Sequence, residues 1–298
     1  MITIGEIIRI NRIEQKISQE NLSYGICSVS NLSRIENGVQ TPSRATFESL
    51  MERLKISPEV FPSFVNENEV GAYRLKHQIS KKIGDGKMDE AELLLNKLDD
   101  GQKHERLYKQ FIQYIRIVLR RGKENSSGSV LIDMKKVAKM SIKDCSPKKI
   151  IHQVLTKDDL HILNSLAISY YNAGEKNEGI ELLYSLKDYM EQKVVDDDGI
   201  SPLYTMVLYN LSKWVGLAGN HNEAILLCDK AIQRCIEYGA YISFANLLYN
   251  KGYALVMLER KDEAKKYLQE SYYIDRARGK IYNCETTKKF ANKHKLHI

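Results

Sequence analysis

The chain has 298 residues, of which 43% are hydrophobic and 28% are charged, and its formal net charge at pH 7 is +7. This length predicts about two domains. The apolar runs fall short of the roughly 18 residues that a membrane-spanning helix needs, and the first residues lack the pattern of a secretory signal. The five cysteines are scattered and form no Cys-x-x-Cys pair, which is typical of a reducing compartment. We therefore expect a cytoplasmic protein with no membrane partner.

The excess positive charge lies at the end of the chain. Residues 1–66 contain seven Lys or Arg and seven Asp or Glu, whereas residues 276–298 contain seven basic residues against Glu285 alone. The net charge is therefore no argument that the first part of the chain binds DNA. We expect the C-terminal lysines to form the solvated face of a helix.

Helical patterns dominate from one end to the other. With only five prolines and seventeen glycines, and no strand-like alternation of useful length, the sequence predicts an all-α protein. Pro58 and Pro62 bracket the expected domain boundary. We expect short helices in a first domain, residues 1–65, and a helical repeat domain in residues 66–298.

Four stretches of the second domain repeat one pattern, in which a polar turn and a glutamate precede a small residue on an amphipathic helix. The four small residues are Ala91, Gly179, Ala224 and Ala264. Each lies twelve positions after a residue of the preceding helix, and these partners are Ile79, Ala167, Ser212 and Gly252. This spacing resembles the tetratricopeptide repeat, whose helix hairpins stack into a solenoid. We expect about five repeats in residues 70–276 and a capping helix in residues 281–298.

The stretch SQENLSYGICSVSNLSRIENG, residues 18–38, predicts two short helices joined by a tight turn. Ser18 and Ser28 are suited to N-caps, and Gly38 is suited to the position after the second helix. Two such helices form a helix-turn-helix, which places its second helix in the major groove of DNA. Burial of Leu32 and Ile35 would turn the polar side chains of the second helix outward.

The outward side chains are candidates for DNA contacts. Arg34 can donate two hydrogen bonds to a guanine edge, Val29 can contact a thymine methyl group, and Gln19 can bind a phosphate at a helix N-terminus. The full set of predicted DNA-binding residues is Gln19, Ser28, Val29, Ser30, Asn31, Arg34 and Arg44. Ser28 can alternatively act only as a cap, and Glu36 as a structural acid.

The segments SQENL, NLSRIENG and TPS resemble the Xre-type repressor helix-turn-helix. The turn is one residue shorter than in most of that family and contains Ile26 and Cys27. This departure resembles the peptide-sensing Rgg, PlcR and PrgX group, and most closely its PlcR-like members. The resemblance implies a homodimeric transcription regulator that binds a double-stranded DNA operator. It also implies control by a short signalling peptide, as in quorum sensing, bound in the concave face of the repeats.

The first helix of each repeat pair would line this concave face. Asparagine is a poor helix former, and its amide can grip the backbone of an extended peptide. Asn164, Asn210 and Asn250 occupy the positions that the resemblance implies for this role. The predicted peptide-binding residues are Asn164, Asn172, Met206, Asn210, Lys213, Asn246, Asn250, Tyr253 and Met257. The alternative is that the asparagines hydrogen-bond neighbouring helices.

No pattern of catalysis is present. The chain lacks a Gly-rich phosphate loop, a Gly-x-Ser-x-Gly turn and a His-Glu-x-x-His helix. His294 and His297 are too few ligands for a metal, and the aspartates at 196–198 lack the alternation of a calcium loop. We expect no enzyme, no catalytic residue, no metal and no cofactor. Two alternatives stay open: a repeat scaffold tethered to DNA, and a phosphatase-type modulator of a response regulator.

Overall fold

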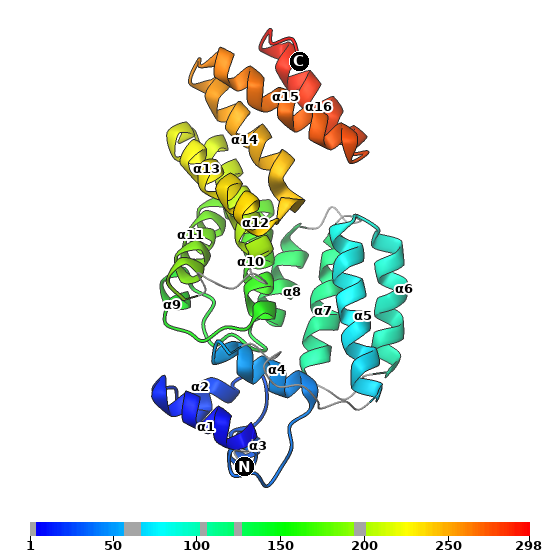
Figure 1. Cartoon of the computed structure of the whole chain (residues 1–298), viewed down its shortest axis with the longest axis vertical. Helices are drawn as coiled ribbons and strands as arrows, with labels where there is room; N and C mark the ends of the chain where they lie inside the picture. Colours follow the sequence, from blue (N-terminus) through cyan, green and yellow to red (C-terminus); the bar gives the residue numbers. More distant parts are fainter. Residues whose placement is uncertain (1–3, 57–66, 102–105, 122–126, 194–200) are drawn as a thin grey trace. The chain divides into compact units, whose positions relative to one another are not determined.

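A computed structural model of the chain describes residues 4–56, 67–101, 106–121, 127–193 and 201–298 (Figure 1). The regular structure in these segments is helical, and none of them contains a strand. The prediction of an all-α protein is therefore confirmed. The expected boundary at Pro58 and Pro62 and the aspartates at 196–198 lie outside the described residues.

The chain forms two compact units, Met1–Lys176 and Asn177–Ile298. The helices of the first unit are α1 (Ile4–Glu14), α2 (Gln19–Ser23), α3 (Val29–Glu36), α4 (Arg44–Arg53), α5 (Glu67–Gly84), α6 (Met88–Gly101), α7 (Arg106–Arg121), α8 (Ser127–Ala138), α9 (Pro147–Ile150) and α10 (Lys157–Asn172). Helix α11 (Lys176–Lys193) begins at the last residue of the first unit. The second unit continues with α12 (Ser201–Leu217), α13 (His221–Tyr238), the 3-10 helix η2 (Tyr241–Ser243), α14 (Phe244–Met257), α15 (Lys261–Ala277) and α16 (Ile281–Lys293).

The four N-terminal helices enclose a small apolar core. Its fully buried members come from every helix, because the apolar residues recur at helical spacing on the inner faces. They are Ile8, Leu22, Ile26, Leu32, Ile35, Phe47, Leu50, Met51 and Leu54. Leu32 and Ile35, which the sequence predicts to be buried, belong to this core, and the half-buried Ile4 packs against it.

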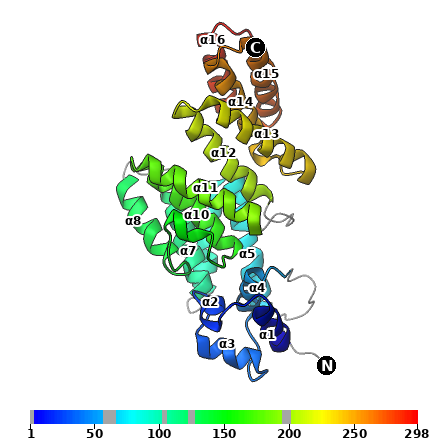
Figure 2. The same cartoon turned by 90° about the vertical axis from the view of Figure 1, so that its left-hand side faces the viewer.

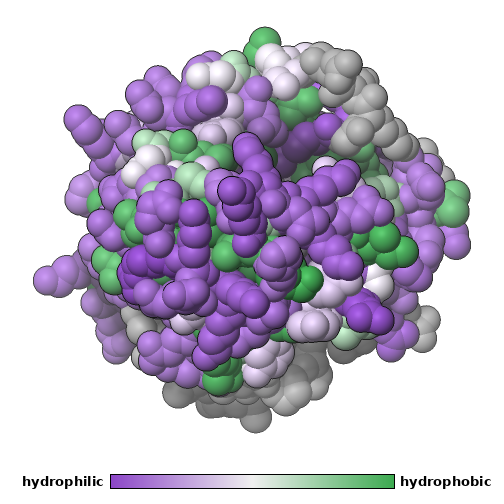
Figure 3. Space-filling view, turned by 90° about the horizontal axis from the view of Figure 1, so that it is seen from above, coloured by the Kyte–Doolittle hydropathy of each residue, from purple (hydrophilic) through white to green (hydrophobic). Residues whose placement is uncertain are grey.

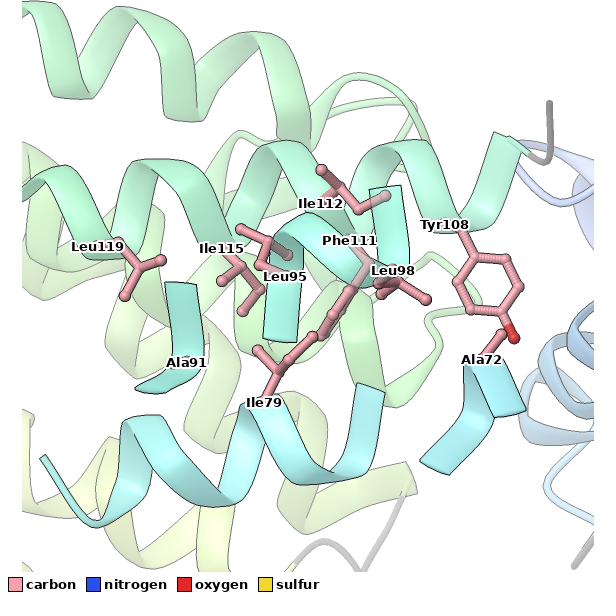
Figure 4. Packing of buried hydrophobic residues seen from close by; sticks show 10 residues of the cluster. All are labelled: Ala72, Ile79, Ala91, Leu95, Leu98, Tyr108, Phe111, Ile112, Ile115 and Leu119. Atoms are coloured by element: carbon pink, nitrogen blue, oxygen red, sulfur yellow. The ribbon is translucent and has the colours of Figure 1, made fainter. Parts of the chain in front are cut away.

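Helices α5, α6 and α7 share a second core (Figure 4). Ile79 of α5 and Ala91 of α6 are both 0% exposed, as the predicted hairpin crossing requires. Phe111, Ile115 and Leu119 of α7 follow one another at four-residue spacing and point toward these two helices. Helix α7 is therefore packed along its length against the first hairpin.

The hairpin of α14 and α15 shows why a small residue is needed at a crossing. A Cβ atom added to Gly252 would lie 2.8 Å from two side-chain carbons of Leu268, and Leu268 is 0% exposed. Ala264, across the crossing, is also 0% exposed. Helix α16 covers α14 and α15 through Ala291 and Phe290. In the first unit α5 packs against α6 and α7 against α8, and in the second unit α12 packs against α13 and α14 against α15. The division into about five successive helix pairs, with α10 and α11 as the third, stays a prediction.

The face drawn in Figure 3 is mostly hydrophilic, with apolar groups in small separate areas. Helix α16 has exposed lysines on one face, among them Lys288, Lys289 and Lys293. Thr287 and Ala291, on the opposite face of the same helix, are buried. The C-terminal lysines thus lie on the solvated face of an amphipathic helix, as expected from the sequence.

Candidate functional site

A serine side chain caps the N-terminus of each of the two helices of the helix-turn-helix. The Ser18 Oγ accepts a hydrogen bond from the backbone N–H of Asn21 at 3.1 Å, and the Ser28 Oγ accepts one from Asn31 at 3.1 Å. Both predicted N-caps are confirmed. Between them, Gly25 has φ +75°, a left-handed conformation that favours glycine. These local features hold α2 and α3 close together.

Helix α3 exposes a polar face with two apolar anchors beneath it. Leu32 and Ile35 are 0% and 1% exposed, whereas Ser30 and Arg34 are exposed and Val29 is 44% exposed. The Arg34 side chain has no hydrogen-bond or ion-pair partner within the described part of the chain. Figures 1 and 2 show α3 at the end of the first unit farthest from α7 and α10. Its outward side chains are therefore accessible to a partner as large as a DNA duplex.

Two of the predicted DNA-binding residues, Asn31 and Arg44, have side chains that are not simply exposed to solvent. Asn31 is half-buried, and its Oδ1 lies in the interior without a hydrogen-bond donor. Arg44 is on α4, where its Nε donates to Glu48 Oε1 at 2.7 Å, one helical turn away. An approaching phosphate would have to compete with Glu48 for Arg44.

Gln19 and Glu36 are joined in a polar cluster that connects α1, α2 and α3. Arg12 donates from Nε and Nη2 to the two carboxylate oxygens of Glu36, at 2.6 and 2.9 Å. Gln19 Nε2 donates to Glu36 Oε2 at 2.7 Å. Burial raises the pKa of Glu36, but the hydrogen bonds from Arg12 and Gln19 outweigh this effect, so its pKa lies below the ordinary range. Glu36 is thus a structural acid, and Gln19 stays a prediction as a phosphate ligand.

Arg53, at the end of α4, connects the helix-turn-helix with the helices that follow it in the first unit. Its Nη1 donates to the carbonyl oxygens of Leu22 at 3.0 Å and Tyr24 at 2.5 Å, at the end of α2. Its Nη2 donates to the carbonyl oxygen of Ser141 at 3.2 Å and to Asp159 Oδ2 at 3.4 Å. Sequence reasoning missed this residue, because an arginine in the last turn of a helix carries no sign of burial.

The segment after α8 also touches the turn of the helix-turn-helix. A Cβ atom on Gly25 would lie 2.4 Å from the Cα atom of Ser141, so only glycine permits this approach. Lys143 Nζ donates to Glu20 Oε1 at 2.8 Å and to Asn21 Oδ1 at 3.0 Å, both on α2. The helices of the helix-turn-helix and the helices that follow them therefore form one packed body within the first unit.

A second group of charges lies where α4 meets α5 and α10. Glu52 Oε2 accepts the backbone N–H of Lys157 at 3.1 Å, and Lys76 donates to Asp158 Oδ2 at 2.5 Å. Burial, reinforced by the nearby Asp158 carboxylate, raises the pKa of Glu52 to about 7. These side chains line a cavity of about 200 Å³ together with Glu48 and His77. The charge on this junction therefore changes near neutral pH.

The three principal asparagines of the predicted peptide site are buried. Asn164, Asn210 and Asn250 are 2%, 9% and 7% exposed. Asn250 Nδ2 donates to the carbonyl oxygen of Tyr209 at 3.2 Å and to Ser212 Oγ at 3.1 Å, and so connects α14 with α12. The alternative that an asparagine bonds a neighbouring helix therefore holds for Asn250. All three stay predictions as peptide ligands.

The other predicted peptide-binding residues have varied surroundings. The ring centroids of Tyr253 and Phe290 of α16 are 5.3 Å apart. Met257 packs against the buried apolar residues that α14, α15 and α16 share. Asn246 Oδ1 accepts a hydrogen bond from Asn283 Nδ2 at 3.5 Å. The remaining three are Asn172 and Lys213, which are exposed, and Met206, which is half-buried.

The described segments contain no group of three or more His, Cys, Asp or Glu side chains placed to hold a metal ion. His294 instead lies against the Phe290 ring, with 4.7 Å between centroids. Every helix in the described residues is too short or too polar to cross a bilayer.

Comparison with known protein families gives two matches. The helix-turn-helix family matches residues 8–61, and the RNPP family C-terminal domain matches residues 103–296. The second match alone covers well over half of the chain. The chain belongs to the RNPP family. The predicted resemblance to peptide-sensing regulators of the PlcR-like type is thereby confirmed.

Solved structures share the fold of this RNPP family chain. Bacillus thuringiensis PlcR in complex with the peptide PapR7 and DNA has a TM-score of 0.65 and 20% identity, over 96% of this chain and 99% of that chain. Its apo form has a TM-score of 0.60 and 19% identity, over 96% and 98%. ComR from S. thermophilus, in complex with DNA and its signalling peptide ComS, has a TM-score of 0.56 and 15% identity, over 99% and 100%. No curated protein sequence matches the chain.

The RNPP assignment decides the class of protein. A helix-turn-helix precedes the RNPP C-terminal domain, and both belong to DNA-binding regulators. Two expectations are thereby confirmed: the chain is a transcription regulator rather than an enzyme, and a helical repeat domain follows the helix-turn-helix.

Proposed function

We propose that this RNPP protein is a sequence-specific, cytoplasmic transcription regulator whose DNA binding is controlled by a short signalling peptide. In this proposal, residues 1–65 bind the operator, and residues 66–298 bind the peptide and another copy of the chain. The observation that carries it is the exposed polar face of α3 in a unit that also contains the first repeat helices.

The DNA part of the proposal rests on the chemistry of α3. An arginine without an internal partner can donate two parallel hydrogen bonds to the O6 and N7 atoms of guanine. Arg34 satisfies this condition among the described residues. Of its exposed neighbours, Ser30 can hydrogen-bond a base edge or a phosphate oxygen, and Val29 can contact a thymine methyl group. The N-terminal backbone N–H groups of α2 supply a phosphate site of the ordinary helix-terminus kind.

The peptide part rests on the asparagines that the sequence predicts as ligands, on α10 in the first unit and on α12 and α14 in the second. Each helix carries a buried or nearly buried asparagine, Asn164, Asn210 or Asn250. An amide on such a helix can bond a peptide backbone while it keeps a bond within the protein, since it has two donors and an acceptor. The PlcR and ComR structures of the same fold contain both DNA and a peptide, which supports a ligand of this kind here.

A homodimer completes the proposal. One helix-turn-helix reads only a few base pairs, whereas two copies can bind half-sites about 34 Å apart on one face of the duplex. The combined contacts then reach the affinity that operators require. Analytical ultracentrifugation of the full chain with and without operator DNA measures this state directly.

The DNA proposal is tested by selecting bound sequences from a randomised duplex library. The full chain should enrich one motif. Arg34→Ala should weaken binding by about 1–3 kcal/mol and relax the preference at one base pair. Arg116→Ala is the matched control, because Arg116 is an exposed arginine of α7 that pairs with Asp99. Failure to enrich any motif, or equal losses from the two variants, contradicts the DNA assignment.

The peptide proposal is tested with synthetic peptides encoded by short reading frames beside the gene. We expect one of them to bind the full chain by calorimetry and to change its DNA binding. Asn210→Ala should lose about 1–3 kcal/mol of peptide affinity, whereas Asn96→Ala, an exposed asparagine of α6, should lose none. Asn250→Ala is a poorer test, because it also removes the bonds to Tyr209 and Ser212.

A further inference from the structure

Helix α7 carries three arginines in its C-terminal half, and they differ in their partners. Arg116 Nη2 donates to Asp99 Oδ2 at 2.6 Å, and Arg120 Nη2 donates to Asp133 Oδ2 at 2.6 Å. Arg121, next to Arg120 in the chain, points to a different face of the helix. No carboxylate pairs with it in the described part of the structure, so it is the unmatched cation of the three.

Arg121 is held by neutral groups of α10. Its Nη2 donates to the carbonyl oxygen of Ser165 at 3.0 Å and to the hydroxyl of Ser169 at 3.0 Å. Its Nε is buried and has no acceptor. Tyr114 of α7 adds a hydroxyl 3.0 Å from the Ser165 Oγ. A guanidinium is thus brought to a site that is rich in hydroxyl groups and lacks a negative charge.

Such an arrangement is costly for the protein alone. A half-buried cation loses hydration, and neutral acceptors compensate for this loss less well than a carboxylate does. Burial accordingly lowers the pKa of Arg121. The same two hydrogen bonds between α7 and α10 could be made by an uncharged side chain. The charge therefore requires a reason other than helix packing.

The surroundings of Arg121 come from one face of α7 and one face of α10, where Ser165 and Ser169 are buried at 5% and 1% exposed. Tyr114 and Arg121 are seven residues apart on α7, and Ser165, Ser169 and Asn172 follow one another at four and three residues on α10. These spacings place each set on one helix face. Asn172, which the sequence predicts to bind peptide, is exposed at the end of the α10 row. Both α7 and α10 are first helices in the predicted division into pairs.

We propose that Arg121 is an anchor for a carboxylate of the regulatory ligand. This inference rests on the proposed function, because it names the group by which the peptide is held. Arg121 forms a charge-assisted pair with the carboxylate, and Tyr114, whose hydroxyl lies 3.0 Å from Ser165 Oγ, is the nearest candidate for a hydroxyl donor. The Ser169 hydroxyl already donates to the Ser165 carbonyl oxygen at 2.8 Å and stays a neutral support of Arg121. The carboxylate comes either from the C-terminus of the peptide or from an acidic side chain, and the test separates these sources.

The first arm of the test uses acetate as the probe and does not depend on the peptide. The full chain is labelled with ¹⁵N-arginine, and the Nε–H resonances are followed by NMR while acetate replaces chloride at constant ionic strength. The Arg121 resonance, assigned by its loss in Arg121→Gln, should shift in a saturable manner. Arg116 should not shift in this way, because Asp99 already occupies it. Absence of a saturable shift contradicts a carboxylate site.

The second arm uses three pools of random heptapeptides captured by the full chain and identified by mass spectrometry. One pool has a free C-terminal carboxylate and no acidic residues, one is amidated with no acidic residues, and one is amidated with a single Asp or Glu. Wild type should retain peptides from the first or the third pool, which identifies the source of the carboxylate. It should retain few from the second.

Variants show whether Arg121 is responsible for this selection. Arg121→Gln should bind the retained peptides roughly tenfold more weakly or worse, since a charge-assisted bond is lost. Arg121→Lys, which keeps the charge, should bind between wild type and Arg121→Gln. Arg116→Gln, at the paired position, should bind like wild type. If Arg121→Gln fails to fold, the Arg121→Lys affinity and the wild-type pool comparison still decide the matter.

The outcomes separate this inference from the proposed function. Equal retention of all three pools, or full affinity in Arg121→Gln, overturns the carboxylate anchor and leaves peptide sensing intact. A saturable acetate shift at Arg121 with no peptide retained from any pool keeps the anion site and contradicts peptide sensing. Neither a shift nor a retained peptide contradicts both.

Discussion

Arg53 and Asp159 form an ion pair in which both side chains are 1% exposed, with 3.4 Å between Nη2 and Oδ2. The two residues are 106 positions apart in the sequence. Asp159 also accepts the backbone N–H of Thr156 at 2.9 Å and so caps α10, while Arg53 binds the carbonyl oxygens at the end of α2. The helix-turn-helix and the repeat helices of the first unit therefore share one buried polar network. A displacement of α10 would act directly on the DNA-binding helices.

Removal of Arg53 should be strongly destabilising. Arg53→Met leaves Asp159 as a buried carboxylate without its cation, and we expect a loss of about 3–5 kcal/mol in the free energy of unfolding. Denaturant unfolding followed by circular dichroism measures this loss. Addition of Asp159→Asn should restore part of it. Arg44→Met is the control, because the Arg44 pair with Glu48 is partly exposed and contributes about 0–1 kcal/mol. Equal losses from the two single variants argue against a buried network.

The helix-turn-helix offers a matched pair of glycines, one in the turn between α2 and α3 and one after α3. Gly25 and Gly38 have φ of +75° and +71°, so an alanine at either position costs about 1–2 kcal/mol of backbone strain. Only Gly25 is crowded, since its Cβ atom would lie 2.4 Å from Ser141 Cα, whereas no atom lies within 4 Å at Gly38. Gly25→Ala should therefore lower the melting temperature clearly more than Gly38→Ala. Similar shifts would mean that Ser141 does not pack on the turn.

The repeat crossings can be tested with a second pair of glycines. Gly252→Ala forces a methyl group to within 2.8 Å of Leu268, which is buried and has little room to move, and should cost about 1–3 kcal/mol. Gly71→Ala, in α5, meets open space and should stabilise the helix by about 0.5–1 kcal/mol. Thermal unfolding of both variants checks the opposite signs. A gain in stability from Gly252→Ala would show that the crossing is looser than described.

Glu52 should make the stability of the protein depend on pH. Its pKa is about 7 in the folded chain and 4.5 ordinarily, so the folded state binds the proton more tightly than the unfolded state. Its contribution to stability is then fully present below pH 4.5 and is lost as the pH rises through 7. Glu52→Gln keeps the acceptor for Lys157 and removes the charge beside Asp158. The free energy of unfolding of Glu52→Gln, relative to that of wild type, should therefore increase by about 1–3 kcal/mol between pH 5 and pH 8.

Urea unfolding at pH 5 and pH 8 measures the effect of Glu52. The difference between wild type and Glu52→Gln isolates this residue, because Lys76 and the other titrating groups of the junction are present in both proteins. Glu48→Gln is a useful comparison, since Glu48 lines the same cavity. If the difference in free energy of unfolding between the two proteins is the same at pH 5 and pH 8, the pKa of Glu52 is not raised in the folded chain.

The sequence by itself determined the features that depend on near neighbours in the chain. Ser18 and Ser28 cap helices because their acceptor groups meet N–H groups three residues ahead. Leu32 and Ile35 are buried because their spacing puts them on one face of α3. The helix pairs follow from the same periodicity and from small residues such as Gly252. These signals also carried the family resemblance, since they belong to segments of a few residues.

Only the tertiary structure decided which long polar side chains meet across helices. Arg53 and Arg121 are both arginines at the end of a helix, yet Arg53 pairs with Asp159, whereas Arg121 bonds Ser165 and Ser169 and no carboxylate among the described residues. The Asn250 amide bonds Ser212 of α12, a contact that its place on α14 does not predict. The partner of such a side chain depends on the packing of residues far away in the sequence. Helical periodicity gives the face of the helix on which it lies, whereas the atom that it contacts is set by how the helices cross.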